Sequence, residues 1–224
     1  MLHLTPRLSA VAGLVRPCET VADIGTDHAY VPAFLLQTGV AQRAIAADIH
    51  EKPLENAKKT LERFGLLNRA ELRLSDGLQG FRAGEAQAFV IAGMGGEQIA
   101  AMLHAASWLQ APEIQLVLQP MTHGEDVRRA LRENGFSRVE ERTVAEGSRL
   151  YLVLWARWTG EIQPVSPAYD YIGALCPQAR ETDRLFLRRT AARLQKKADA
   201  LRGKDPTAAK KLDSILQEVY DACR

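Results

Sequence analysis

Reactive side chains are concentrated in one short segment, residues 23–30, which contains Asp23, Gly25, Asp27, His28 and Tyr30. The segment follows a run of strand-forming residues, and a glycine at a strand end lets the backbone turn sharply and approach a ligand closely. Carboxylate, imidazole and phenol groups beyond such a turn can move protons or stabilise a developing positive charge. The segment is therefore the first candidate for a binding and catalytic loop.

Short β-rich runs alternate with helical patterns around this loop. They predict strands over residues 20–24, 43–48, 70–74, 88–92 and 114–118, and helices over 53–65, 97–107 and 124–134. The near-continuous apolar character of the last two strands is typical of strands buried on both faces of a parallel sheet. Two further β-rich runs, 137–145 and 150–157, are joined by a turn and predict a closing hairpin. The prediction is an α/β fold with seven strands and a final antiparallel hairpin, as in class I (Rossmann-like) methyltransferases. A dehydrogenase-type sheet would more often keep its last strand parallel.

The last quarter of the chain has a different pattern. Residues 159–167 contain three chain breakers and read as a linker. Apolar residues then repeat at spacings of 4, 3, 4, 3, first from Leu187 to Leu201 and again from Ala208 to Ala222, which predicts an antiparallel helical hairpin, a short coiled coil. We expect Gly203 to end the first helix in a left-handed conformation and Asp205 to cap the second. The predicted domains are residues 1–160 and 161–224.

Charge and cysteine usage narrow the class of protein. Residues 180–224 carry 12 Lys and Arg against 7 Asp and Glu, a net +5, within a chain whose total net charge is +2. This asymmetry permits a polyanionic partner. The three cysteines are an odd number without CxxC spacing, which favours a reducing compartment. No apolar run reaches membrane-spanning length and no secretory signal is evident, so we expect a soluble, cytoplasmic protein.

Four features fall at successive strand ends. They are the turn at Gly25, Asp48, the Asp76-Gly77 pair, and the glycine-rich run 93–96. Parallel sheets bind ligands beyond the carboxyl ends of their strands, where Asp48 could accept hydrogen bonds from both ribose hydroxyls of an adenosine. Taken singly, each feature is more simply a turn, a helix cap or an exposed acid. Their joint placement favours an adenosine-containing cofactor.

The loop after Gly25 distinguishes between two such cofactors. A dinucleotide site needs the G-x-G-x-x-G pattern, so that a helix N-terminus can bind pyrophosphate. Here no second or third glycine follows, and the Asp27 carboxylate would repel a pyrophosphate. A carboxylate suits instead a sulfonium ligand with an α-amino group. The loop therefore favours S-adenosylmethionine over NAD.

Residues 23–32 (Asp-Ile-Gly-Thr-Asp-His-Ala-Tyr-Val-Pro) and 91–96 (Ile-Ala-Gly-Met-Gly-Gly) closely resemble motifs of the bacterial tRNA adenine-22 N1-methyltransferase family. Supporting pieces occur in order along the chain, and the C-terminal hairpin matches the family's coiled-coil domain. They are Arg7-Leu8 in an N-terminal helix, the Asp48 to Pro53-Leu54 step, Ser75-Asp76-Gly77 and Leu118-Gln119-Pro120. One departure is Met121, where an asparagine that would contact substrate often follows the Gln-Pro pair.

The resemblance implies methyl transfer from S-adenosylmethionine to N1 of an adenine in the D-arm of tRNA, with no metal. The target base must leave its pairing or stacking, because N1 lies on its Watson–Crick edge. Alkylation makes the ring cationic, and Asp27 is the candidate to stabilise that charge or accept the N6 proton. Tyr30 and His28 would orient or stack on the base. The alternatives are that Asp27 holds the cofactor's amino group and that His28 is only structural.

The predicted site has three parts. The catalytic candidates are Asp27, His28 and Tyr30. The cofactor-binding candidates are Asp23, Gly25, Thr26, Asp48, Ile49, Asp76, Gly77, Ala92, Gly93 and Met94. The substrate-binding candidates are Arg7, Gly95, Gln119, Pro120, Arg189, Arg193, Lys196 and Lys197.

The last four of these residues fall near one helix face and could bind tRNA phosphates. The alternative is that they form a solvated outer face. Arg128, Arg129 and Arg132 are a second, weaker candidate for phosphate contacts.

Two rival functions remain open from the sequence. The same fold could methylate a protein or small molecule, with the helical hairpin as a dimerisation element. The chain could also be a non-catalytic binding module, although its complete set of strand-end acids argues against that. We expect a monomer or weak dimer with tRNA as partner.

Overall fold

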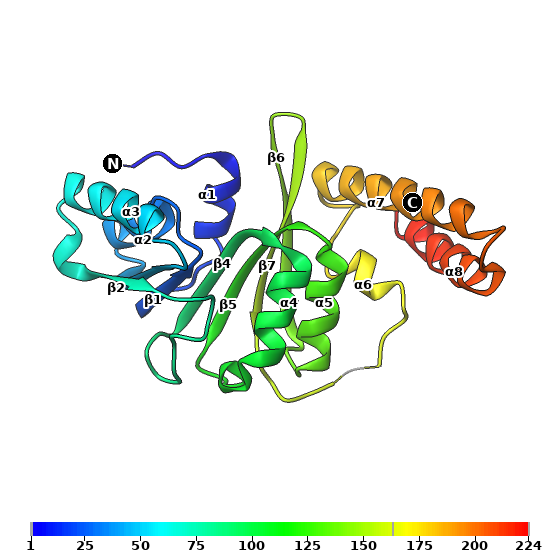
Figure 1. The fold of residues 1–224 in the computed structure, drawn as a ribbon. Helices are drawn as coiled ribbons and strands as arrows, with labels where there is room; N and C mark the ends of the chain where they lie inside the picture. Colours follow the sequence, from blue (N-terminus) through cyan, green and yellow to red (C-terminus); the bar gives the residue numbers. More distant parts are fainter. Residues whose placement is uncertain (1, 163, 224) are drawn as a thin grey trace.

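The computed structural model describes residues 2–162 and 164–223 and contains one seven-stranded sheet (Figure 1). The strands are β1 (Cys18–Ile24), β2 (Ala41–Asp48), β3 (Ala70–Leu74), β4 (Ala88–Gly95), β5 (Gln115–Thr122), β6 (Arg138–Glu146) and β7 (Arg149–Arg157). The helices are α1 (Pro6–Ala12), α2 (Tyr30–Thr38), α3 (Glu51–Arg63), α4 (Gly96–Ala105), α5 (Gly124–Glu133), α6 (Tyr169–Ile172), α7 (Glu181–Leu201) and α8 (Pro206–Ala222). Gln163, in the predicted linker, lies outside the described residues.

The strand order is β3-β2-β1-β4-β5-β7-β6. The first five strands of this order pair in parallel, and β7 runs antiparallel to both β5 and β6. The predicted sheet with its final antiparallel hairpin is therefore confirmed. The order reverses between β1 and β4, which is where an open parallel sheet binds its ligand.

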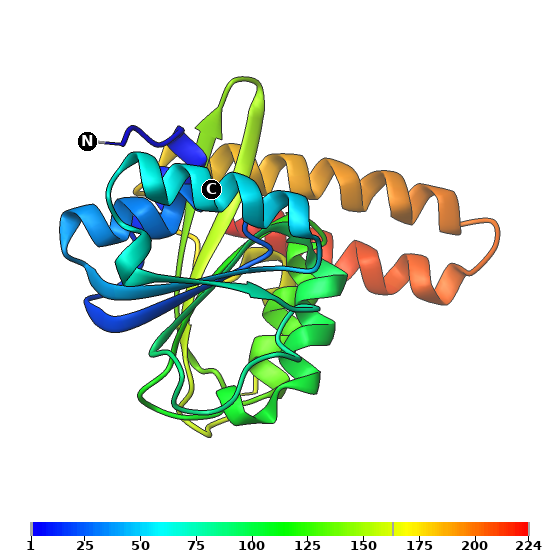
Figure 2. The same ribbon diagram turned by 60° about the vertical axis from the view of Figure 1, so that its left-hand side comes forward.

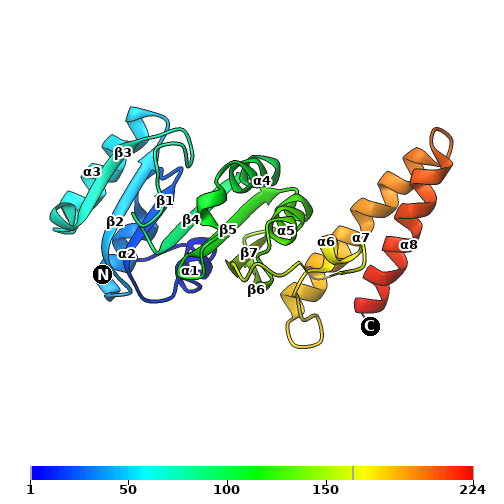
Figure 3. The same cartoon turned by 90° about the horizontal axis from the view of Figure 1, so that it is seen from below.

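Helices cover both faces of the sheet, as Figures 1 and 3 show. Alternate strand residues supply the two layers, because side chains along a strand point to opposite faces. Ile24, Phe89 and Ile91 pack with buried residues of α4 and α5. Val21 and Val90 pack on the other face with buried residues of α1, α2 and α3. Within the described residues, no helix is both long and apolar enough to cross a membrane.

Strand β4 runs through Gly95 instead of ending at Ala92 as predicted. Its pairing with β5 shifts register on both sides of Met94, and Gly93 adopts φ +83° there. A bulge of this kind bends a strand while keeping it in the sheet, so the expected open turn is an irregular strand end. At Gly96 a Cβ atom would lie 2.1 Å from the His123 carbonyl oxygen, so close packing explains this glycine.

Helix α2 is absent from the elements that the sequence predicts. Its buried residues Val31, Ala33, Leu35 and Leu36 leave little contrast between an apolar and a polar face. Prediction by periodicity depends on that contrast, so a helix covered on most sides gives a weak signal. The helix begins after Ala29, which takes the left-handed conformation with φ 52°.

The C-terminal helices α7 and α8 lie side by side and extend away from the sheet (Figure 2). Leu187, Ala191, Leu194 and Ala198 of the predicted seam are buried. The Asp205 carboxylate accepts the backbone N–H of Ala208 at 2.9 Å, which confirms the predicted cap. Gly203 does not have the predicted positive φ, because α7 ends in a right-handed turn at Arg202.

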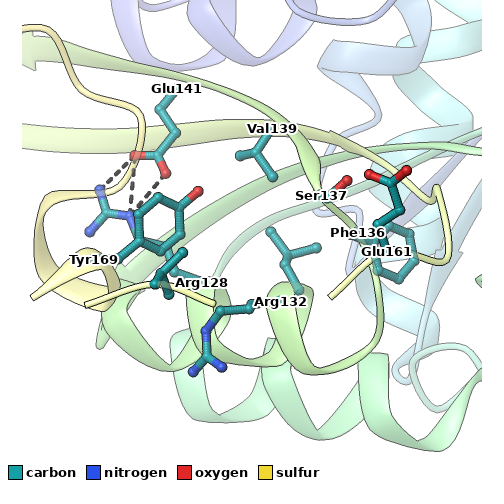
Figure 4. A pocket seen from close by; sticks show the side chains of 10 residues that line it. Arg128, Arg132, Phe136, Ser137, Val139, Glu141, Glu161 and Tyr169 are labelled. Atoms are coloured by element: carbon teal, nitrogen blue, oxygen red, sulfur yellow. Dashed lines mark hydrogen bonds and ion pairs between the residues drawn. The ribbon is translucent and has the colours of Figure 1, made fainter. Parts of the chain in front are cut away.

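A buried ion pair between α5 and β6 attaches helix α6 to the sheet (Figure 4). The Arg128 guanidinium of α5 donates to the Glu141 carboxylate of β6 at 2.6–3.2 Å, and both side chains are at most 3% exposed. Its remaining nitrogen donates to the carbonyls of Asp170 and Tyr171 in α6. The Arg128 guanidinium therefore forms its hydrogen bonds inside the protein, to Glu141 and to α6.

The weaker phosphate-binding candidate is wrong for Arg128, since a buried guanidinium cannot meet an RNA phosphate. Arg129 is bound by Asp126 and Asp170, and Arg132 lies 3.5 Å from Asp170. The three arginines of α5 thus hold α6 against the sheet.

Replacing Glu141 with glutamine leaves the buried Arg128 charge without a carboxylate. We expect the free energy of unfolding to fall by about 3–5 kcal/mol, the usual cost of removing one partner from a buried pair. Denaturant unfolding would measure this. The control is Asp213→Asn, which breaks the exposed 3.2 Å pair with Arg202 and should cost at most about 1 kcal/mol. Equal losses for the two variants would contradict the structural role of the buried pair.

Candidate functional site

The loop from Asp23 to Ala29 is fixed by backbone hydrogen bonds to the neighbouring strand. The N–H groups of Gly25 and Thr26 both donate to the Ala47 carbonyl, at 2.8 and 2.9 Å. Gly25 takes φ +75°, a conformation that glycine adopts without steric cost. The loop therefore leaves β1 along the end of β2, and brings the ends of these two strands together.

A side chain at position 25 would also have to displace Met94. A Cβ atom at this position would lie 2.1 Å from the methyl carbon of Met94. Met94, a predicted cofactor-binding residue, does not line the loop cavity described below. Its side chain packs instead over the turn that shapes the cavity. This glycine keeps a backbone surface open that any larger residue would fill.

A cavity of about 440 Å³ lies above this turn, within the size range of small-molecule sites. We call it the loop cavity. It brings together most of the residues predicted to hold cofactor or substrate base. Those that line it are Arg7, Asp23, Gly25, Thr26, Asp27, His28, Tyr30, Ala92 and Gly93.

Asp23 is the buried acid of the loop cavity. Burial raises its pKa to about 6, the nearby Asp48 charge adds to the rise, and a hydrogen bond from the Thr26 hydroxyl opposes it. The same hydroxyl accepts the backbone N–H of Ala29 at 3.2 Å. Thr26 thus links the buried carboxylate to the start of α2.

The charged side chains that line the cavity suit a ligand that carries two positive groups and one negative group. Asp23 and Asp27 are its acids, and Arg7 is the one lysine or arginine among the residues that line it. A ligand with a sulfonium, an ammonium and a carboxylate would meet groups of opposite charge for each of these. The open backbone at Gly25 and Gly93 gives such a ligand close access.

His28 and Tyr30 form an aromatic pair on the outer side of the cavity. Their rings are stacked at a centroid distance of 5.1 Å and an interplanar angle of 8°. Asp27 lies beside them, with a carboxylate oxygen 3.5 Å from His28 Nε2 and a side chain 76% exposed. The acid and the ring pair are therefore accessible from solvent at the cavity.

The other strand-end residues lie around the loop cavity without lining it. The Asp48 carboxylate accepts the His50 N–H at 2.8 Å, and Ile49 is exposed. Asp76 and Gly77 line a neighbouring cavity of about 540 Å³, bounded on its other side by α4. Of the predicted cofactor residues, Asp76 and Gly77 therefore line a second cavity, whereas Asp48 and Ile49 line neither of the two.

Gln119 does not present its amide to substrate as predicted, because it is fully buried. Its amide oxygen accepts Arg7 Nη1 at 2.7 Å, and its amide nitrogen donates to the Pro120 carbonyl at 2.9 Å. The residue therefore positions the Arg7 side chain at the edge of the loop cavity. Gly95 lines none of the described cavities, although its neighbour Gly93 faces the Arg7 guanidinium.

The predicted basic face of α7 is divided by its contacts. Arg193 pairs with Glu125 at 2.9 Å, and Arg189 donates to the Ser148 carbonyl at 3.2 Å. These two arginines face the sheet, whereas Lys196 and Lys197 are exposed further along the helix. The four residues do not form one free stripe.

Glu146, which no sequence motif indicates, fixes the N-terminal segment. Its carboxylate accepts the backbone N–H of Arg7 at 2.9 Å. This bond, with a further one from the Thr5 side chain, holds the pKa of Glu146 below its ordinary value. Thr5 followed by Pro6 is a recognisable helix start, but no local pattern pairs it with an acid 141 residues away.

One group of described residues could chelate a cation. Glu97, His123 and Asp126 bring ligand atoms within 4.8 Å of one another. Glu97 and His123 are exposed, and His123 Nδ1 lies 3.2 Å from the Glu97 carboxylate. Contacts between the histidine and the two carboxylates account for this cluster.

The raised pKa of Asp23 predicts pH-dependent cofactor binding. A cationic ligand favours the ionised carboxylate, so affinity for S-adenosylmethionine should rise as pH rises through about 6. Ionisation of a single such group makes binding about tenfold tighter at about pH 7 than at about pH 5. Calorimetric titration at these two values measures the effect. Asp23→Asn should weaken binding and remove the pH dependence; a variant that keeps the full tenfold change would assign it to another group.

Comparison with known proteins places the chain in a family. Residues 4–154 match the family described as "Methyltransferase domain". The tRNA (adenine(22)-N(1))-methyltransferase of Bacillus subtilis (strain 168) is 34% identical over 200 residues, which are 87% of this chain and 82% of that protein.

Solved structures agree over almost the whole chain. The B. subtilis M1A22 tRNA methyltransferase TrmK superposes with a TM-score of 0.86 at 28% identity and covers 100% of both chains. Streptococcus pneumoniae Sp1610, solved in complex with S-adenosyl-L-methionine, gives a TM-score of 0.80 at 28% identity, covering 99% of this chain and 100% of that one. The chain therefore belongs to the tRNA (adenine(22)-N(1))-methyltransferase family.

Proposed function

We propose that this protein methylates N1 of adenine 22, in the D-arm of tRNA, using S-adenosylmethionine. The observation that carries the proposal is the loop cavity, where a buried acid, an exposed acid and a stacked ring pair surround an open backbone turn. Membership of the family names the reaction, and the cavity supplies groups suited to both reactants. The activity belongs to tRNA maturation in the cytoplasm, carried out by a monomer or weak dimer.

The cofactor supplies an electrophilic methyl group when bound. Asp23 would face its positively charged part, and Arg7, held by Gln119, would face its carboxylate. Asp48 would accept the ribose hydroxyls, with Ile49 beside the adenosine, and the Asp76-Gly77 turn would meet its adenine. Electrostatic complementarity of this kind orients the reactive group without any covalent role for the protein.

Asp27 is the residue that we assign to the target base. N1 of neutral adenine is a weak nucleophile. As the bond from N1 to the methyl forms, the methyl–sulfur bond would break, so the cofactor would leave as a neutral thioether and its positive charge would pass to the ring. A carboxylate beside N6 stabilises that charge and can accept the N6 proton, which leaves a neutral product base. His28 and Tyr30 offer a flat surface on which the displaced base can stack.

The helical segment 161–224 is the proposed tRNA-contacting domain. Arg189 and Arg193 lie where it meets the sheet, and Lys196 and Lys197 continue outward along α7. Together these four residues would bind tRNA phosphates along a path from the catalytic face to the hairpin. The affinity for tRNA would then depend strongly on salt concentration.

Incubation with unmodified tRNA and labelled S-adenosylmethionine tests the function directly. We expect label in tRNA and a reverse-transcription stop at adenine 22, because a methyl on N1 blocks Watson–Crick pairing. A transcript with guanine at position 22 is the matched control and should take up no label. Transfer to a pyrimidine, to protein alone, or to nothing would reject the proposal.

Asp27→Asn separates the two roles considered for this residue. If the carboxylate serves the base, kcat should fall by about 10²–10⁴-fold, the usual contribution of a positioned acid or base, with the affinity for S-adenosylmethionine nearly unchanged. If it holds the cofactor's amino group, calorimetry should show weaker cofactor binding instead. Wild-type values for both would remove Asp27 from the site. Asp199→Asn, on the exposed surface of α7, is the control.

A further inference from the structure

A further cavity lies where helix α7 meets the end of β5 and the start of α5. Its volume is about 230 Å³, and we call it the junction cleft. The residues that line it include Pro120, Glu125, Phe186, Arg189 and Arg193. Both predicted domains contribute to its walls, so it exists only because α7 is held against the sheet.

A short chain of contacts connects the junction cleft to the loop cavity. Arg7 lines the loop cavity and is hydrogen bonded to Gln119, whose neighbour Pro120 lines the cleft. The β6–β7 turn makes a second connection, because Glu146 accepts the Arg7 N–H and Ser148 accepts from Arg189. A chain with one base in the loop cavity would therefore continue toward the cleft.

The cleft has the composition of a groove for single-stranded RNA. Such grooves combine basic side chains for the backbone with aromatic side chains for the bases. Arg189 and Arg193 supply the first, and Phe186 and Tyr171 the second. In the described part of the chain Arg189 bonds only to a neutral carbonyl, so its charge is not matched by a carboxylate.

Glu125 is the one acid among the residues that line the cleft. Its carboxylate forms an ion pair with the Arg193 guanidinium. Its two carboxylate oxygens lie 2.9 Å from two nitrogens of Arg193, and its side chain is 15% exposed. Burial alone would raise the pKa of Glu125, but Arg193 and the residue's own N–H outweigh it and hold the pKa below its ordinary value. Glu125 is therefore an anion across the range in which tRNA binds.

We infer that the junction cleft binds the RNA backbone next to the methylated adenine, and that Glu125 is an internal anion which an RNA phosphate displaces from Arg193. Planar guanidinium groups bind carboxylate and phosphate through the same forked geometry, so the two anions compete for one site. When the phosphate is absent, the Glu125 pair keeps Arg193 in place. When it is present, Glu125 opposes binding both by occupying Arg193 and by its own charge.

This inference rests on the proposed function and makes an unusual prediction, that loss of an ion pair improves binding. Glu125→Gln should bind unmodified tRNA about two- to fivefold tighter than wild type, the range expected from the energy of a partly exposed pair. The KM for tRNA should fall in parallel, while the affinity for S-adenosylmethionine stays unchanged. Filter binding at several salt concentrations measures the affinity for tRNA, and steady-state kinetics with tRNA as the varied substrate measures the KM.

Two further variants complete the experiment. Arg189→Gln should weaken tRNA binding and lower the slope of log affinity against log salt by about one, as loss of one phosphate contact predicts. Asp213→Asn also frees an arginine from an exposed pair, but at the far end of the hairpin, and should leave tRNA affinity at the wild-type value. Thermal unfolding of each variant monitors folding.

The outcomes distinguish the inference from the proposed function. If wild-type protein methylates tRNA but Glu125→Gln binds it no tighter than Asp213→Asn does, the pair is only a structural brace and the inference is wrong. The same holds if Arg189→Gln keeps the full salt slope, as it would if the cleft received a protein instead. If wild-type protein neither binds nor methylates tRNA, the proposed function fails and the inference falls with it.

Discussion

The parallel strand ends at one edge of the sheet are the constraint on which the site depends. The Ala47 carbonyl accepts two successive N–H groups of the loop after β1, so the turn at Gly25 cannot move independently of β2. That turn brings Asp23, Asp27, His28 and Tyr30 together in the lining of the loop cavity. Two residues with positive φ, Gly25 and Ala29, accomplish this change of direction within five positions. Binding and catalytic candidates thus lie on one short, rigid segment.

A second set of buried polar contacts sets where the C-terminal helices begin. Asp183, fully buried in α7, accepts hydrogen bonds from Thr143 of β6, from Arg180 and from the backbone of Cys176. The buried pair of Arg128 and Glu141 supplies a parallel attachment through α6. An ion pair out of water is costly unless its hydrogen bonds are satisfied, and here nearby carbonyls satisfy them. Such contacts specify one orientation of α7, which apolar packing alone would leave less well defined.

Local patterns were sufficient for the sheet and the hairpin, and insufficient for contacts between distant segments. Alternating and heptad-like spacings predict strands and seams because burial on one face repeats along the chain. Helix α2 escapes this logic, since it is apolar on most sides, and so does the bulge that carries β4 through Gly95. Motif positions indicated the residues of the loop cavity. They could not indicate that Gln119 is buried, that Arg128 faces Glu141, or that Glu125 meets Arg193 across 68 residues, because each depends on tertiary packing.

The buried amide of Gln119 connects the N-terminal helix α1 to the end of strand β5. Its oxygen holds Arg7 toward the cofactor side, and its nitrogen holds the strand end at Pro120, which forms a wall of the junction cleft. The β6–β7 turn makes a second connection, because Glu146 accepts a hydrogen bond from Arg7 of α1 and Ser148 accepts one from Arg189 of α7. The first link centres on an amide that is fully buried, so breaking it leaves unpaired polar atoms, whereas the Arg189–Ser148 bond of the second link is exposed to water. In the function that we propose, cofactor binding on one side and phosphate binding on the other would therefore act on the same short stretch of backbone. A rigid connection of this kind can align a base with the methyl group even though the two are held by different parts of the chain.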